Sequence, residues 1–143
     1  MDRLPPSGEV RDGTLSGICY TEANLTEVFV TEVFETWWHG LTIGEQEDVA
    51  FVVRLLEARG VALGFPYSSA IRGSRLRLRE LRVSAEGEAL RVLYAFDPWR
   101  SAILLIGGSK VGRGGRFYGE AVPRAERLYR EYVKRRELEE EEE

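Results

Sequence analysis

The spacing of apolar residues changes along the chain from a helical period in 33–56 to alternation after residue 76. In 33–41 and 49–56, apolar side chains recur at helical spacing, which predicts two amphipathic helices. In 80–83 and 91–96 the side chains alternate with a period of two, which is typical of strands. Helices followed by strands within one short chain predict an α+β fold.

Local signals mark the ends of the first elements. The β-branched and aromatic run 25–31 predicts a strand ahead of the two helices. Thr42 and Glu45 form a capping-box pattern at the start of the second helix, and Gly60 is placed to end it. Because the connection between the two helices is short, we expect them to form an antiparallel hairpin.

The second half of the chain predicts a meander and a last helix. Composition indicates turns at 85–88 and 97–100, and the run 102–106 is apolar on both faces, as in a strand buried on both sides of its sheet. Pro123 is suited to the first position of a final helix. The predicted order is therefore strand, helix, helix, three-stranded antiparallel meander and C-terminal helix.

Composition limits the class of protein. We expect one folded domain at 25–136, preceded by an irregular arm at 1–24 and followed by an acidic tail at 137–143 with six glutamates. No apolar run approaches the roughly 20 residues of a membrane span, and the N-terminus lacks the pattern of a signal peptide. Cys19 is the only cysteine and His39 the only histidine of the sequence. We therefore expect no disulfide, no structural zinc, no cofactor and a cytoplasmic location.

Charge is segregated along the chain. Residues 1–71 hold 4 basic and 11 acidic side chains, whereas residues 72–136 hold 16 basic and 7 acidic ones. Such a basic block is a plausible electrostatic footprint for a polyanion. The alternative is that these arginines are ordinary solvated surface residues.

Short sequence motifs occur in a characteristic order over residues 27–133. Together they resemble the RelE/HigB superfamily of toxins, in particular its phage-related HigB branch. The matching segments are 31–38, 45–50, 64–67, 71–74, 79–83, 91–98, 103–110 and 117–118, followed by Pro123 and Ala125.

The resemblance implies a small RelE-like α+β sandwich and a defined activity. Members of this superfamily are toxins of type II toxin–antitoxin systems. As endoribonucleases they cut mRNA on the ribosome without a metal, by attack of the 2′-hydroxyl on the adjacent phosphate. Their partner is a cognate helix-turn-helix antitoxin. Two alternatives remain open, a ParE-like toxin that inhibits gyrase and a non-catalytic module that binds RNA or protein.

The resemblance also suggests site residues. Arg82 and Arg91 are the expected phosphate clamp because guanidinium binds phosphate bidentately and stays charged; whether they share a face depends on strand register. Lys110 and Tyr118 are candidate acid or base groups, since a cationic pocket would favour their deprotonated forms. Glu80 is an alternative base, weakened by nearby arginines. The cations expected to contact RNA are Arg72, Arg77, Arg79, Arg113 and Arg116.

Each candidate also has a purely structural interpretation. Arg82 can pair with a neighbouring glutamate, Arg91 can cover apolar surface with its stem, and Tyr118 can pack beneath the last helix. His39 is expected to cap or pack at the end of the first helix. The glutamate tail is either a solvated helix end or a segment that folds over the basic face and competes with RNA.

Overall fold

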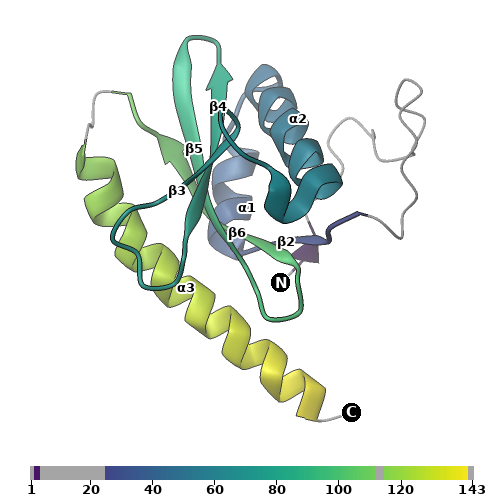
Figure 1. Ribbon diagram of the computed structural model, residues 1–143. Coiled ribbons are helices and arrows are strands. Elements are labelled where there is room, and N and C mark those ends of the chain that lie inside the picture. The colour runs from purple at the N-terminus through teal and green to yellow at the C-terminus, as the bar shows by residue number, and fades with distance from the viewer. Residues whose placement is uncertain (1, 4–24, 112–114, 142–143) are drawn as a thin grey trace.

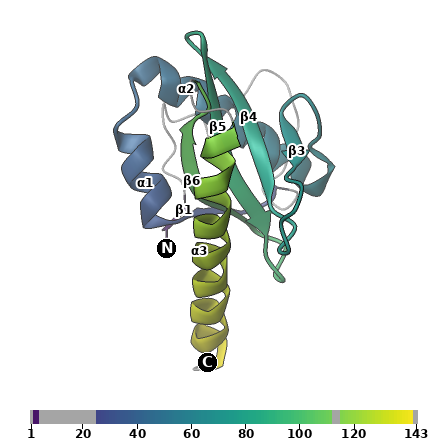
Figure 2. The ribbon, with the colours of Figure 1, turned by 90° about the vertical axis from the view of Figure 1, so that its left-hand side faces the viewer.

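The computed structural model describes residues 2–3, 25–111 and 115–141. Within these residues, a six-stranded mixed sheet lies between two layers of helix (Figures 1 and 2). The elements are β1 (Asp2–Arg3), β2 (Val28–Val30), α1 (Glu32–His39), α2 (Ile43–Arg59), a 3-10 turn (Gly60–Ala62), β3 (Ser68–Ala70), β4 (Arg79–Ala85), β5 (Glu88–Phe96), β6 (Ala102–Ser109) and α3 (Gly115–Glu141). The α+β class and the predicted order of the elements are confirmed.

The strands follow the order β1-β2-β6-β5-β4-β3 across the sheet. β4, β5 and β6 form the predicted antiparallel meander, and β2 lies parallel to β6. Glu86 and Gly87 connect β4 to β5 with φ of 51° and 82°, and positive φ at both central residues matches the twist of a tight hairpin. β3 pairs with β4 but was not predicted, because its sequence Ser-Ser-Ala carries no strand signal.

The helix caps follow the sequence signals. Thr31 accepts a hydrogen bond from the backbone N–H of Phe34 and donates one to the carbonyl of Leu105, which fixes the start of α1 on β6. Thr42 and Glu45 form the predicted capping box at the start of α2. Gly60 ends this helix with φ of 55°, in the left-handed region that favours glycine.

Two apolar clusters occupy the two faces of the sheet. One packs α1 and α2 against Leu81, Val92 and Leu104, and the other packs α3 against Leu93 and Leu105. Because side chains alternate between the faces of a strand, β6 is buried on both sides, as its apolar run predicted. α3 lies across one face and continues beyond the edge of the sheet (Figure 1).

The prediction that Pro123 begins the final helix is wrong. α3 begins at Gly115, and Pro123 lies inside it. Proline cannot donate to the carbonyl of Gly119 four residues earlier, but both residues are exposed, so water can hydrate that carbonyl. Phe117 and Ala121 are buried ahead of the proline, and this packing stabilises the early turns of the helix.

The two predicted ends of the chain fall partly on described residues. Of the arm predicted at 1–24, the structure describes only β1, which pairs with β2. Of the acidic tail predicted at 137–143, residues 137–141 continue α3 and are exposed. Among the helices of the described ranges, none combines the length and the apolar character needed to cross a membrane.

Candidate active site

The β4–β5 hairpin places two arginines side by side. Arg82 on β4 lies directly opposite Arg91 on β5 in the antiparallel register. Glu80 lies two residues before Arg82, so its side chain is on the same face of the sheet. That face is the one covered by α3, which brings Tyr118 to the same place.

Glu80 is the centre of this group. It is only 6% exposed. Its Oε1 accepts a hydrogen bond of 2.7 Å from the hydroxyl of Tyr118 and lies 3.7 Å from Nε of Arg91. Its Oε2 accepts one of 3.0 Å from Ser69 and one of 3.4 Å from Arg82. We call these five residues, Ser69, Glu80, Arg82, Arg91 and Tyr118, the Glu80 cluster.

The two arginines differ in their access to solvent. The side chain of Arg82 is 30% exposed, and its guanidinium lies 5.4 Å from the centre of the Phe65 ring. Arg91 is buried, and its Nη1 donates to the carbonyl of Leu90. The Nε of Arg91 is buried without a hydrogen-bond partner among the described residues. A buried donor without an acceptor is costly, so this N–H would gain from an anion that reached it.

Tyr118 is held in its protonated form. Burial raises the pKa of Tyr118 most, the hydrogen bond and the charge of Glu80 raise this pKa further, and Arg91 opposes them. The pKa of Tyr118 therefore shifts in the direction opposite to the expected one, because burial and then the neighbouring carboxylate of Glu80 favour the protonated phenol. Nζ of Lys110 lies 5.5 Å from the centre of the Tyr118 ring. The backbone N–H of Lys110 donates to Ala89 and so fixes its place after β6.

The structure thus brings Arg82, Arg91 and Tyr118 together around Glu80, and Lys110 lies beside Tyr118. The predicted RNA-contacting cations lie apart from one another. Arg79 lies on the opposite face of the sheet, where it donates to Ser68 and Tyr94. That placement removes it from the site, because one residue of difference along a strand reverses the side chain.

Three of the remaining predicted cations are exposed, and the fourth lies outside the described residues. Arg72 is exposed at the edge of a pocket next to the cluster. Arg77, with φ of 55°, is in the exposed loop before β4, and Arg116 is exposed in the first turn of α3. Arg113 lies outside the described residues, and His39 ends α1, as expected.

Sequence reasoning missed the part played by Ser69 and the central position of Glu80. Ser69 comes from β3, a strand without a sequence signal, and it reaches Glu80 because the two residues are paired in the β3–β4 register. A glutamate flanked by arginines on one strand was the only available signal for Glu80.

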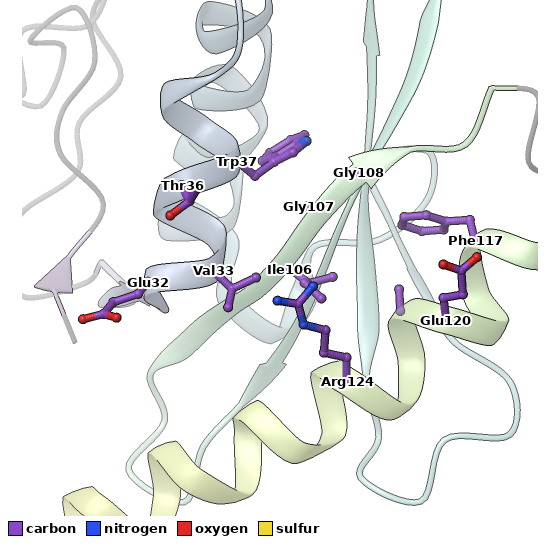
Figure 3. Close-up of a pocket in the computed structure, with 11 residues that line it drawn as sticks. Glu32, Val33, Thr36, Trp37, Ile106, Gly107, Gly108, Phe117, Glu120 and Arg124 are labelled. Atoms are coloured by element: carbon purple, nitrogen blue, oxygen red, sulfur yellow. The ribbon is translucent and has the colours of Figure 1, made fainter.

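Two pockets lie on either side of the first turns of α3. The larger, about 720 Å³, is between α1 and α3 over the end of β6 (Figure 3). Trp37 and Phe117 pack over Gly107 and Gly108, where a Cβ atom would meet their rings. No member of the Glu80 cluster lines this pocket. The smaller, about 530 Å³, is lined by Glu80 and Tyr118 among others.

Comparison with known proteins agrees with the motif pattern. The chain is 38% identical over 104 residues to a protein of Mycobacterium tuberculosis (strain ATCC 25618 / H37Rv) named "Putative toxin HigB2", which covers 71% of this chain and 52% of that protein. It is 38% identical over 93 residues to "Putative toxin HigB3" of the same strain, covering 64% of this chain and 80% of that protein. The chain therefore spans about half the length of the first relative. No solved structure gives a significant match.

A family model described as "Phage derived protein Gp49-like (DUF891)" matches residues 36–130. The matched range contains β3, β4, β5 and β6 and the first turns of α3, and so all five residues of the Glu80 cluster. Since this range is more than half of the chain, the protein belongs to the phage-derived Gp49-like family, the HigB-like branch that its motifs indicated.

Proposed function

We propose that this chain is the toxin of a type II toxin–antitoxin pair and that it cuts mRNA on the ribosome. Its similarity to two proteins named as HigB toxins supports the toxin assignment. The single observation that carries the nuclease assignment is the pairing of Arg82 opposite Arg91, with Tyr118 joined to both through Glu80.

The arginines supply charge at the phosphate. Arg82, which is partly exposed, binds the scissile phosphate bidentately through its planar guanidinium group. The Nε of Arg91, which has no hydrogen-bond partner among the described residues, donates to the same group as charge develops. Lys110 adds a third positive charge beside Tyr118. Fixed cations of this kind stabilise a phosphorane without reorganising during the reaction.

Glu80 and Tyr118 move the protons. The 2′-oxygen attacks phosphorus, the bond from phosphorus to the 5′-oxygen breaks, and a 2′,3′-cyclic phosphate remains. Glu80 accepts the 2′ proton, while Tyr118 gives its phenolic proton to the departing 5′-oxygen. The hydrogen bond between the two groups, 2.7 Å long, then returns the proton from Glu80 to Tyr118 and restores both.

The partners follow from the same proposal. The substrate is mRNA in the decoding site, and the inhibitor is a cognate helix-turn-helix antitoxin that covers the basic face or blocks entry to the ribosome. The excess of basic over acidic residues in 72–136 suits both a polyanionic substrate and an acidic cover. Ribosomes and gyrase both lie in the cytoplasm, which is where we place its action.

Cell-free translation with primer extension tests the proposed function. The wild-type chain should produce cuts within translated codons, and Arg82→Ala should produce none while remaining folded by circular dichroism. Arg91→Ala should behave in the same way and should also cease to arrest growth. Intact mRNA together with inhibited gyrase supercoiling would favour the ParE-like activity instead. Intact mRNA with active gyrase would leave a module that binds RNA or protein.

A further inference from the structure

The smaller pocket beside the Glu80 cluster lies between the loop after β3 and the early turns of α3. Arg72, Glu80 and Tyr118 are the polar residues of its lining, and the other lining residues are apolar or glycine. These other residues are Ala70, Ile71, Gly73, Gly119, Val122 and Pro123. Its volume of about 530 Å³ is within the range of small-molecule sites.

We propose that this pocket binds a nucleobase of the RNA, the base of a nucleotide that flanks the scissile phosphate. The inference rests on the proposed nuclease function and adds to it the place where the substrate is gripped. Apolar walls suit the faces of a planar heterocycle, as in other sites that accept a base away from its stack. Because Glu80 and Tyr118 belong to both the pocket and the cluster, a base held here places its ribose beside the groups that move protons.

Hydrogen bonds join the two elements that line the pocket, the loop after β3 and α3. Oε2 of Glu126 on α3 accepts hydrogen bonds of 3.1 Å from Ser74 and of 3.3 Å from the backbone N–H of Arg75. The hydroxyl of Ser74 in turn accepts from the backbone N–H groups of Leu76 and Leu78. The two walls are therefore held at a fixed separation before any ligand enters, which lowers the entropy cost of binding.

The pocket is open to solvent, and its lining includes one exposed cation, Arg72. Cβ atoms built on Gly73 and Gly119 would meet no atom within 4 Å, so both glycines border open space. Arg72 is exposed on the same lining, where it can contact the RNA backbone without reading sequence. The larger pocket between α1 and α3 lacks this connection to the proton-moving groups, and so it is the weaker candidate.

Binding of small nucleotides to the full chain tests the inference. The probes are adenosine and cytidine 3′- and 5′-monophosphates, with ribose 5-phosphate and inorganic phosphate as probes that lack a base. Affinities are measured by calorimetry, and the site is located by backbone amide shifts of Gly73 and Gly119. We expect the nucleotides to bind at least about tenfold more tightly than the base-free probes, because only they bury a ring in the pocket.

Substitution of Gly119 gives the matched variants. Gly119→Leu adds an apolar side chain to the pocket lining, at a position where a Cβ atom meets no other atom within 4 Å, and should reduce nucleotide affinity to that of ribose 5-phosphate. Gly119→Ala should give an intermediate loss. Glu131→Leu puts the same side chain on an exposed position of α3 away from the pocket and should leave nucleotide affinity unchanged.

Each outcome separates the two proposals. Equal affinity for nucleotides and base-free phosphates would refute the base pocket while leaving the phosphate site intact. Tight nucleotide binding that Gly119→Leu does not weaken would place the base elsewhere and also overturn the inference. If no probe binds, including inorganic phosphate, the phosphate site of the proposed function fails together with the pocket.

Discussion

At the scale of single residues, Glu80 determines how the two arginines are used. In the free protein its carboxylate forms ion pairs with Arg82 and Arg91 and accepts the hydrogen bond of Tyr118. A phosphate that enters must compete with this carboxylate for the same guanidinium groups. Glu80 thus opposes substrate binding and serves the chemical step, and substitution can separate the two effects.

Glu80→Gln should tighten RNA binding and slow cleavage. The amide keeps the shape of the side chain but removes the competing charge and the proton acceptor, and loss of a general base costs about 10²–10⁴-fold in rate. Binding is measured by fluorescence anisotropy and rate by single-turnover cleavage on programmed ribosomes. Glu131→Gln makes the same change of charge on the exposed surface and should alter neither. Weaker RNA binding by Glu80→Gln would contradict the competition.

Tyr118→Phe should slow cleavage by about 10²–10⁴-fold with little change in RNA affinity, because it removes the proton donor and leaves the arginines in place. Burial and Glu80 raise the pKa of Tyr118 above its usual 10, so the phenol stays protonated at neutral pH. The wild-type rate should therefore show no loss from ionisation of this tyrosine below pH 10. An unchanged rate in Tyr118→Phe would exclude it as the acid.

Motif order nominated Arg82, Arg91, Lys110 and Tyr118 as candidates from the sequence, but it did not show that they lie close together. Their convergence depends on the β4–β5 register, which pairs Arg82 with Arg91 and which alternation alone does not fix. The same dependence explains why Arg79 does not lie with them, since its side chain points to the other face. The position of Glu80 at the centre needed the contact between β4 and α3, which are distant in sequence.

At the scale of secondary-structure elements, α3 connects the candidate site to a buried anchor on the sheet. Asp97, after β5, accepts hydrogen bonds from the backbone of Trp99 and Ser101 and one of 2.6 Å from Tyr132. Arg136 completes the group with an ion pair of 3.1 Å to Asp97. This anchor holds the middle of α3, and the early turns that carry Tyr118 extend from it towards the site.

The anchor makes stability sensitive to alkaline pH. Burial raises the pKa of Tyr132 above its unfolded value near 10, as does its hydrogen bond to Asp97, while Arg136 opposes the shift. Above pH 10 the unfolded chain loses this proton while the folded chain retains it, so the stability that the tyrosine contributes falls as pH rises. The unfolding temperature of the wild type should therefore fall between pH 9 and 11.

Tyr132→Phe provides the comparison. It should be less stable than the wild type at pH 7, by about 1–3 kcal/mol, because Asp97 loses a buried hydrogen bond. Its unfolding temperature should fall less between pH 9 and 11. Parallel pH profiles for the two proteins would show that this tyrosine does not titrate differently in the folded state.

Sequence predicted the elements better than their ends. Capping chemistry located α2 to the residue, since Thr42, Glu45 and Gly60 act through local hydrogen bonds and backbone geometry. The start of α3 could not be read in this way. Pro123 lacks the N–H that a helix interior uses, so the sequence indicates a helix boundary there. The packing of Phe117 on Gly108, a contact between distant segments, stabilises helix ahead of the proline nevertheless.

At the scale of the whole molecule, the glutamates at the end of α3 lie far from the site. Glu137 lies nineteen positions after Tyr118 along the same helix, a rise of about 28 Å at 1.5 Å per residue. Figure 1 shows this end of α3 projecting away from the sheet. The arrangement favours a solvated helix end over a cover for the basic face.

Deletion of residues 137–143 should therefore leave RNA affinity and cleavage rate nearly unchanged at about 0.15 M salt, where charges beyond roughly 8 Å are screened. Anisotropy titrations of the shortened and full-length chains make the comparison. A severalfold gain in affinity on deletion would show that the glutamates reach the RNA-binding face after all.

The proposed function requires that Arg82 and Arg91 act on one phosphate. A double-mutant cycle with Arg82→Lys and Arg91→Lys tests it most directly, because lysine keeps an ion partner for Glu80 but loses the planar fork. The measured quantity is the single-turnover cleavage rate on programmed ribosomes. Each single variant should be strongly impaired, and the double variant should lose much less than the product of the two losses. Independent, multiplicative losses, or full activity in either single variant, would contradict a shared phosphate.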